Sequence, residues 1–217
     1  MRNVTLADAR ITGSSSVGGI VGEAYRGEVS NCFVLDVALP DVEKSGAIVG
    51  NNNNATLAAN YYHACTVAGT ANAIGVGTGD GDVAGALSVF TVGGNDIAVA
   101  GTSAVTHDGT NYYVEGSVVT LSYTGELPAG ATCGYVASAG ILDGDSLTLP
   151  AADVTVTAYV MTGLTVNGRD VGFPSGPGWY SDGAHTVYLT NAGPFTVSGS
   201  TDGGYGIEAT TSAQVIL

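Results

Sequence analysis

Three histidines are the first candidates for catalysis in this sequence: His63, His107 and His185. They stand far apart along the chain. A zinc peptidase needs two histidines four residues apart on one helix face, with a glutamate between them, and none of the three has that context. A G-x-S-x-G nucleophile motif is missing as well. We therefore expect no catalytic residue and no enzyme, and each histidine is predicted to be a turn or surface residue.

Two pairs of aspartates, Asp80 with Asp82 and Asp143 with Asp145, offer the oxygen ligands that calcium prefers. Neither pair continues into the D-x-D-x-D-G loop with a glutamate at its twelfth position. The first pair lies in 79–84, which formally satisfies the G-x-G-x-x-A dinucleotide pattern, but its carboxylates would repel a pyrophosphate. Both pairs are predicted to lie in turns, with no metal and no cofactor.

The three cysteines, Cys32, Cys65 and Cys133, are too few and too scattered for a disulfide framework. Their wide spacing fits no zinc pattern. We predict buried free thiols that pack as small apolar residues. A single Cys32–Cys65 bridge stays open as the alternative.

The only tryptophan, Trp179, is predicted to open a strand with Tyr180 after a loop rich in glycine and proline. An exposed indole would offer a flat apolar face to a sugar ring, with Tyr180, Asp182 and His185 as a polar rim. Trp179, Tyr180 and Asp182 are therefore the candidate ligand-binding residues. The preferred alternative is that Trp179 packs under the adjoining loop, because a buried indole would anchor a segment this small.

The composition excludes several classes of function. The 217 residues include 34 glycines, and 5 Lys and Arg stand against 19 Asp and Glu, for a net charge of −14. Nucleic-acid binding needs clustered basic residues, so it is excluded, and anionic membrane surfaces are disfavoured. With 45% hydrophobic residues the chain can bury a core, and no apolar stretch is long enough for a membrane helix.

The first half of the chain contains an internal repeat. Val17–Gly22 returns as Ser45–Gly50, and a degenerate third copy lies at Ala73–Gly77, in which Ala73 takes the place of Ala47. Three flanking positions follow the offset between the first two copies, namely Leu6 with Val34, Ile11 with Leu39 and Val29 with Leu57. Because one such unit cannot bury its apolar side alone, stacking of units is expected.

The repeat predicts an all-β fold in which residues 1–95 form a right-handed β-solenoid. Ile20 should lie above Ile48, and Val21 above Val49, in adjacent rungs. The glycines are expected at corners with positive φ, and the Asn51–Asn54 run is expected to form a corner too. A stacked asparagine ladder inside the solenoid stays open as the alternative for this run.

Beyond residue 95 the sequence predicts two further β-rich segments. Residues 96–160 are interpreted as a small β-sandwich, and residues 161–217 as a segment that opens a second β-helix. The predicted strands are Asp96–Ala100, Asn111–Val114, Val118–Tyr123, Cys133–Ala137, Ser146–Leu149, Val154–Val160, Leu164–Val166, Thr186–Leu189, Phe195–Ser198, Ile207–Ala209 and Val215–Leu217.

The tetrads Gly19–Gly22 and Ala47–Gly50, with their 28-residue recurrence, resemble the GLUG repeat of large bacterial surface proteins. That family includes immunoglobulin-cleaving metallopeptidases and adhesins, and the likeness extends from the start of the chain to about position 80. Tyr113–Leu121 and Leu149–Ala158 look like the repeat modules strung along such proteins. The resemblance implies an accessory module, located outside the bacterial cell or on its surface, and it transfers no catalytic residue.

These observations favour a non-catalytic structural or adhesion segment of a large bacterial surface protein. The chain ends on the apolar residues of a predicted strand, so we expect an internal piece whose partners are neighbouring domains of the same longer chain. Two alternatives stay open. One is a carbohydrate-binding module centred on the third segment, with host or microbial glycans as partners, and the other is an accessory fragment of a polysaccharide-degrading or peptidase enzyme.

Overall fold

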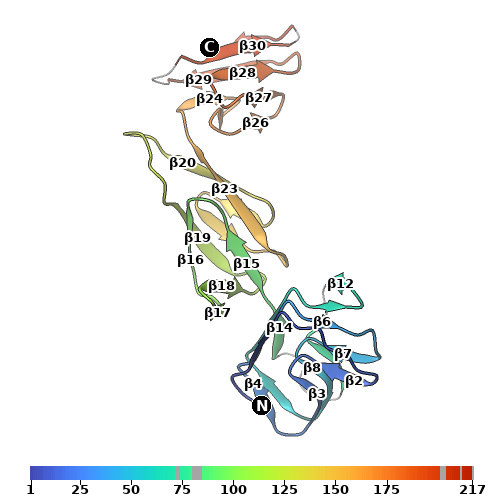
Figure 1. Cartoon of the computed structure of the whole chain (residues 1–217). Helices are drawn as coiled ribbons and strands as arrows, with labels where there is room; N and C mark the ends of the chain where they lie inside the picture. Colours follow the sequence, from blue (N-terminus) through green and yellow to red (C-terminus); the bar gives the residue numbers. More distant parts are fainter. Residues whose placement is uncertain (72–73, 80–84, 201–203, 211, 217) are drawn as a thin grey trace. The chain divides into compact units, whose positions relative to one another are not determined.

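The computed structural model describes residues 1–71, 74–79, 85–200, 204–210 and 212–216 (Figure 1). Within these ranges every regular element is a β-strand and none is a helix. The prediction of an all-β fold is confirmed. Its cause is local, because apolar residues come in short runs interrupted by glycine, asparagine and aspartate, which favour turns over helices.

The chain divides into two compact units. The first contains Met1–Val92, Gly101–Ser117 and Leu149–Asp153. The second contains Gly93–Ala100, Val118–Thr148 and Val154–Leu217. The division at residues 95 and 160 stays a prediction.

Parallel strands dominate the first unit. The larger sheets have the strand orders β1-β5-β10-β14, β13-β8-β3 and β12-β11-β6, and β2 pairs with β7 and β4 with β9. The strands are β1 (Thr5–Ala7), β2 (Ser16–Gly18), β3 (Val21–Tyr25), β4 (Glu28–Ser30), β5 (Phe33–Leu35), β6 (Ala38–Leu39), β7 (Lys44–Gly46), β8 (Val49–Asn53), β9 (Thr56–Ala58), β10 (Asn60–His63), β11 (Thr66–Val67), β12 (Thr70–Ala71), β13 (Val76–Gly79) and β14 (Ala86–Ser88).

The register of these strands follows the sequence repeat. Pairs such as Thr5 with Phe33, Val21 with Val49 and Val29 with Leu57 are parallel and share the offset of the first two motif copies. The Ile20 N–H donates to the Ile48 carbonyl at 3.0 Å. The predicted pairing of the two motif copies is therefore confirmed.

The third copy pairs with the second in a different register from the predicted one. The predicted alignment of Ala73 with Ala47 would set Val76 beside Gly50, but Val76 pairs with Val49. The third copy is therefore displaced by one position from the prediction. Of this copy, Ala73 lies outside the described residues.

The motif glycines have a different role from the predicted one. Gly18 and Gly46 are neighbours in the β2–β7 pair, and neither has positive φ. A Cβ on Gly46 would collide with the Val49 carbonyl oxygen, and one on Gly18 with the Val21 carbonyl oxygen. The close approach of neighbouring backbones, and not a left-handed corner, requires glycine here.

Corners with positive φ are formed by two glycines outside the motif, Gly27 and Gly69, and by other residues that recur with the period of the repeat. The recurring residues are Asn3, Asn31 and Ala59 in one row, Asp8, Asp36 and Ala64 in a second, and Arg26 and Asn54 in a third. Within the Asn51–Asn54 run only Asn54 forms a corner, because residues 51–53 belong to strand β8. Asparagine and aspartate tolerate the left-handed region better than most residues, which explains most of these positions.

A buried core fills the space between the parallel strands. Its members are Val17, Ala24, Val29, Cys32, Val34, Val37, Leu39, Ala47, Ile48, Val49, Ala55, Leu57 and Cys65. Two asparagines of this unit, Asn52 and Asn60, are 0% exposed; Asn60 links backbone groups of the preceding turn of the chain. Its Oδ1 accepts from the Cys32 N–H at 3.1 Å, and its Nδ2 donates to the Val29 carbonyl at 2.9 Å. Asn60 therefore joins one turn of the chain to the preceding one.

We expect Asn60→Ala to lower the free energy of unfolding by about 2 kcal/mol, because two buried backbone groups lose their partners. Asn53→Ala is the matched control, since Asn53 is half-buried and its Oδ1 accepts from the exposed Asn54 amide. Urea denaturation followed by circular dichroism measures both changes. Equal losses in the two variants would contradict the assigned role of Asn60.

Three antiparallel strands complete the first unit. They are β15 (Phe90–Gly93), β17 (Val105–His107) and β18 (Thr110–Tyr113), with β18 paired to both of the others. Phe33, which faces away from Val34 and the main core, packs with Val89 and Tyr112. The β17–β18 hairpin thereby covers the second face of β5.

The second unit begins with antiparallel strands. One sheet has the order β16-β19-β22-β21, and β20 pairs with β23. The strands are β16 (Ile97–Ala100), β19 (Val118–Tyr123), β20 (Cys133–Ala137), β21 (Ile141–Asp143), β22 (Ser146–Thr148) and β23 (Val154–Val160). Strands β19, β20 and β23 have the predicted bounds.

The rest of the second unit contains two four-stranded sheets, β25-β24-β29-β31 and β26-β27-β28-β30. The strands are β24 (Leu164–Val166), β25 (Arg169–Asp170), β26 (Ser175–Gly176), β27 (Trp179–Ser181), β28 (Thr186–Leu189), β29 (Phe195–Gly199), β30 (Gly206–Ala209) and β31 (Val215–Ile216). Two pairs are parallel and have the same offset along the chain, Val187 with Ile207 and Phe195 with Val215.

Candidate functional site

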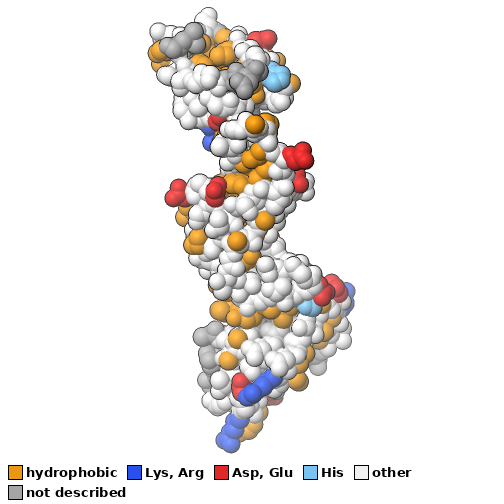
Figure 2. Space-filling view, turned by 90° about the vertical axis from the view of Figure 1, so that its left-hand side faces the viewer, with side chains coloured by type: hydrophobic (Ala, Val, Ile, Leu, Met, Phe, Trp, Pro, Cys, Tyr) orange, Lys and Arg blue, Asp and Glu red, His pale blue; other side chains and the backbone are white. Residues whose placement is uncertain are grey.

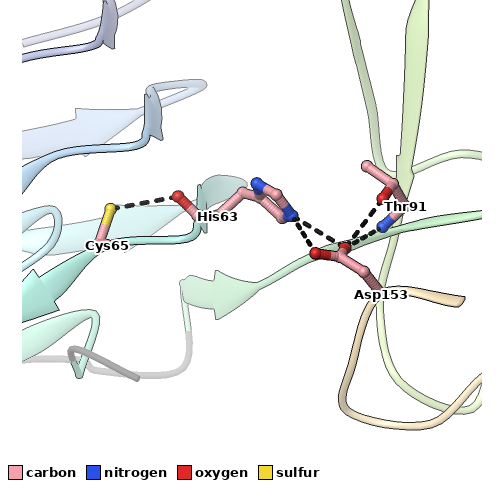
Figure 3. Close-up of polar contacts among 4 residues, drawn as sticks. All are labelled: His63, Cys65, Thr91 and Asp153. Atoms are coloured by element: carbon pink, nitrogen blue, oxygen red, sulfur yellow. Dashed lines mark hydrogen bonds and ion pairs between the residues drawn. The ribbon is translucent and has the colours of Figure 1, made fainter. Parts of the chain in front are cut away.

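One cluster of polar side chains in the first unit joins residues far apart in the sequence (Figure 3). His63 comes from β10, Thr91 from β15 and Asp153 from the stretch Leu149–Asp153. The His63 Nε2 lies 2.9 Å from Asp153 Oδ1 and 3.1 Å from Oδ2. Asp153 Oδ1 also accepts from the Thr91 N–H at 2.7 Å and from its hydroxyl at 2.9 Å. The carboxylate is thus the centre of the cluster.

The electrostatics of the cluster favour an ionised Asp153. Partial burial opposes the charge, but the Thr91 N–H, His63 and the Thr91 hydroxyl together hold the pKa of Asp153 below its usual value. Since a carboxylate can only accept, the ring proton of His63 sits on Nε2. The other ring nitrogen, Nδ1, is buried and has no partner among the described residues. The ring nitrogen with the free lone pair is therefore the buried one.

Cys65 lies close to His63 but does not complete a nucleophile–base pair. Its thiol contacts backbone carbonyls, that of His63 at 3.5 Å and that of Val34 at 3.7 Å. In Figure 3 the thiol and the imidazole lie on opposite sides of the His63 carbonyl. Burial raises the pKa of Cys65, so the reactive thiolate is disfavoured.

A small cavity of ≈ 410 Å³ lies beside the cluster, lined among others by Tyr62, His63, Cys65, Ser88, Phe90 and Asp153. The Tyr112 ring packs edge-on against the imidazole, with 5.1 Å between the ring centres. Asp153 and Tyr112 therefore hold the His63 ring in place. The hydrogen bonds of Asp153 fix the stretch Leu149–Asp153 against β10 and β15.

Because the pKa of Asp153 is lower in the folded chain than its ordinary 3.8, its contribution to stability is complete above that value and lost as the pH falls through the folded pKa. We expect Asp153→Asn to lower the melting temperature at pH 7, and the gap to the unmodified chain to close as the pH falls through the lowered pKa of Asp153. Melting curves from pH 2 to pH 8 test this. Asp41→Asn, at an exposed site, should show no such gap, and a gap that persists at low pH would refute the assignment.

The histidine predictions hold only in part. His63 is no turn or surface residue, because it lies in β10 with 13% of its side chain exposed. His107 ends β17 beside the Asp108–Gly109 turn, and His185 is exposed before β28. Asp153, the partner of His63, is 90 residues away in the sequence. Because the two residues are so far apart in the sequence, no motif based on residue spacing could predict their contact.

The three predicted ligand-binding residues lie in different environments. Trp179 is 2% exposed and packs in a core with Val166, Val187 and Leu189, as the packing alternative expects. Tyr180 points to the other face and is 43% exposed. A binding role for Trp179, Tyr180 and Asp182 stays a prediction.

Asp182 caps the turn before β28. Its Oδ1 accepts from the N–H groups of Ala184, His185 and Thr186 at 2.8, 3.0 and 2.9 Å. The backbone bonds from Thr186, His185 and Ala184 lower the pKa of Asp182 to about 2. This carboxylate therefore fixes the turn, a role that the sequence analysis did not assign to it.

All three cysteines are free thiols; Cys32 and Cys65 are buried and Cys133 is half-buried. No bridge joins Cys32 to Cys65. Across the part of the chain that the structure describes, no three His, Cys, Asp or Glu side chains are grouped so as to hold a metal ion. Asp143 and Asp145 lie at the β21–β22 turn, while Asp80 and Asp82 are outside the described residues.

The described residues contain no helix long and apolar enough to span a membrane. The chain matches no known family model, no curated protein and no solved structure. The sites described above therefore rest on this chain's own geometry.

Proposed function

We propose that this chain is a non-catalytic structural segment of an extracellular bacterial surface protein, which extends or spaces neighbouring domains and takes part in adhesion. In this proposal residues 1–95 wind as a right-handed β-solenoid whose rungs have the length of the sequence repeat. The observation that carries it is the offset shared by six parallel pairs, β1–β5, β5–β10, β2–β7, β3–β8, β4–β9 and β6–β11. Such stacking lets a chain grow in length by adding units.

The His63–Asp153 cluster supports the same proposal. Asp153 accepts from His63 and from Thr91 within the fold, and the neighbouring Cys65 thiol donates to backbone carbonyls. The side chains drawn in Figure 2 are mostly uncharged, and blue Lys and Arg are few among them, as expected from five basic residues in the chain. The likeness of Gly19–Gly22 and Ala47–Gly50 to the GLUG repeat supports a location at the bacterial surface.

The remaining segments fit a spacer as well. We propose that residues 96–160 form a β-sandwich-like module and that residues 161–217 open a second β-helix. The two parallel pairs with a common offset support the second β-helix, because each sets a strand in register beside an earlier strand of the same segment.

Duplicating one repeat inside the full chain tests the proposal. A second copy of residues 31–58, inserted after residue 58, should fold and melt at the same or a higher temperature, with an unchanged β signal per residue in circular dichroism. A stacking unit gains a new interface on both sides, so its insertion is tolerated. An insertion of equal length with the same composition in scrambled order is the control. Unfolding of both insertion variants would overturn the proposal.

A further inference from the structure

Two tyrosines form a stacked pair on the solvent face of the sheet β26-β27-β28-β30. The ring centres of Tyr180 and Tyr188 are 4.8 Å apart and the ring planes differ by 16°. The residues face each other directly across the antiparallel pair β27–β28. Their neighbours along the strands, Trp179, Val187 and Leu189, point into the core and are 2%, 0% and 0% exposed. Alternation along each strand therefore turns the tyrosines outward.

The tyrosines belong to a longer row across the sheet. Ser175 of β26 lies beside Tyr180, and Glu208 of β30 lies beside Tyr188. The row thus reads Ser175, Tyr180, Tyr188, Glu208, with polar groups at its two ends and aromatic rings between them. Three strand spacings of ~4.8 Å give it a length greater than one sugar ring.

We propose that this row binds an uncharged polysaccharide, with Tyr180 as the stacking platform. A pyranose ring has an apolar C–H face, which packs on an aromatic face, and a rim of hydroxyls, which bond to a carboxylate or a hydroxyl. Tyr188 covers one face of the Tyr180 ring, so the sugar packs on the opposite face. Tyr180 is the more exposed of the two rings. Glu208 accepts from sugar hydroxyls, and Ser175 both donates and accepts.

Charge selects a neutral ligand over an acidic one. Burial, Glu208, Asp182 and Tyr180 raise the pKa of Tyr188, so its hydroxyl keeps its proton and can donate. The same carboxylates, in a chain of net charge −14, repel uronic acids and sulfated sugars. This surface differs from the one expected from the sequence, because the platform is Tyr180 with Tyr188 and not Trp179.

Affinity gel electrophoresis of the full chain tests the proposal. Native gels contain hydroxyethyl cellulose, galactomannan or soluble starch as neutral polymers, and polygalacturonate as the anionic one. We expect at least one neutral polymer to slow the chain, and polygalacturonate to have no effect. Tyr180→Leu, which keeps apolar bulk but removes the flat face, should weaken retardation by about tenfold or more, and Tyr180→Phe should keep most of it.

Tyr25→Leu is the matched control, because Tyr25 is 63% exposed in the other unit, and it should be retarded like the unmodified chain. Melting temperatures of all variants separate loss of binding from loss of folding. No retardation by any neutral polymer, or retardation that Tyr180→Leu leaves unchanged, would overturn the proposal. So would retardation that disappears with added salt, since ionic binding is screened whereas ring stacking is not.

Discussion

Gly46→Ala is expected to destabilise the first unit by at least about 3 kcal/mol, because the backbone around Gly46 leaves no room for a methyl group. The added Cβ would meet the Val49 carbonyl oxygen and would lie 2.6 Å from the Gly77 nitrogen. Both are backbone atoms of neighbouring strands, which cannot rotate away as a flexible side chain would. The parallel stack must therefore separate locally at the motif.

Gly93→Ala is the control for this prediction. Gly93 lies in β15, has no positive φ, and a Cβ there would meet no atom within 4 Å. Its substitution should change the free energy of unfolding by less than about 1 kcal/mol. Chemical denaturation followed by circular dichroism compares the two variants. If Gly46→Ala is as stable as Gly93→Ala, the explanation that close backbone approach requires glycine at position 46 is wrong.

The pairing of the first two repeat copies could be predicted, because stacked units need the same spacing of apolar residues and glycines in each copy. A constant offset between apolar and glycine positions is visible in a single sequence, and parallel in-register pairing is the arrangement that uses it. The pairs Gly18 with Gly46 and Val21 with Val49 follow directly. What spacing could not show is why glycine is needed. Positive φ and close backbone approach both require glycine, and only the three-dimensional structure distinguishes the two.

The strands of the second unit could be predicted from alternation. Val118–Tyr123, Cys133–Ala137 and Val154–Val160 have the expected bounds. Short strands such as β25 and β26 were missed, because two residues are too few to show a period.

The candidate sites were less predictable. The His63–Asp153 contact spans 90 residues and depends on tertiary packing alone. For the tyrosine row, the pattern of Thr186–Leu189 does carry a signal, since Val187 and Leu189 point one way and Tyr188 the other. Which strands lie next to β28 is a matter of topology, so the pairing of Tyr188 with Tyr180 and Glu208 could not be read from the sequence.

Trp179→Ala decides between packing and binding for the only tryptophan. The indole is 2% exposed and lies among Val166, Val171, Leu189 and Phe195. Emptying a buried aromatic site costs about 3–5 kcal/mol, so the variant should lose much of the stability of the second unit. Tyr180→Ala, one residue along the same strand but exposed, should cost less than about 1 kcal/mol.

Trp179→Phe separates the effect of lost packing from the effect of the buried indole N–H. The indole N–H is buried and has no hydrogen-bond partner among the described residues, so phenylalanine removes an unsatisfied donor while it loses some packing. We expect a loss of about 1–2 kcal/mol, well below that of alanine. Fluorescence of the unmodified chain gives an independent measurement, because the buried Trp179 should be quenched weakly by acrylamide until the second unit unfolds. Strong quenching in the folded chain, together with an undiminished melting temperature for Trp179→Ala, would show that the indole faces solvent and would restore it as a binding platform.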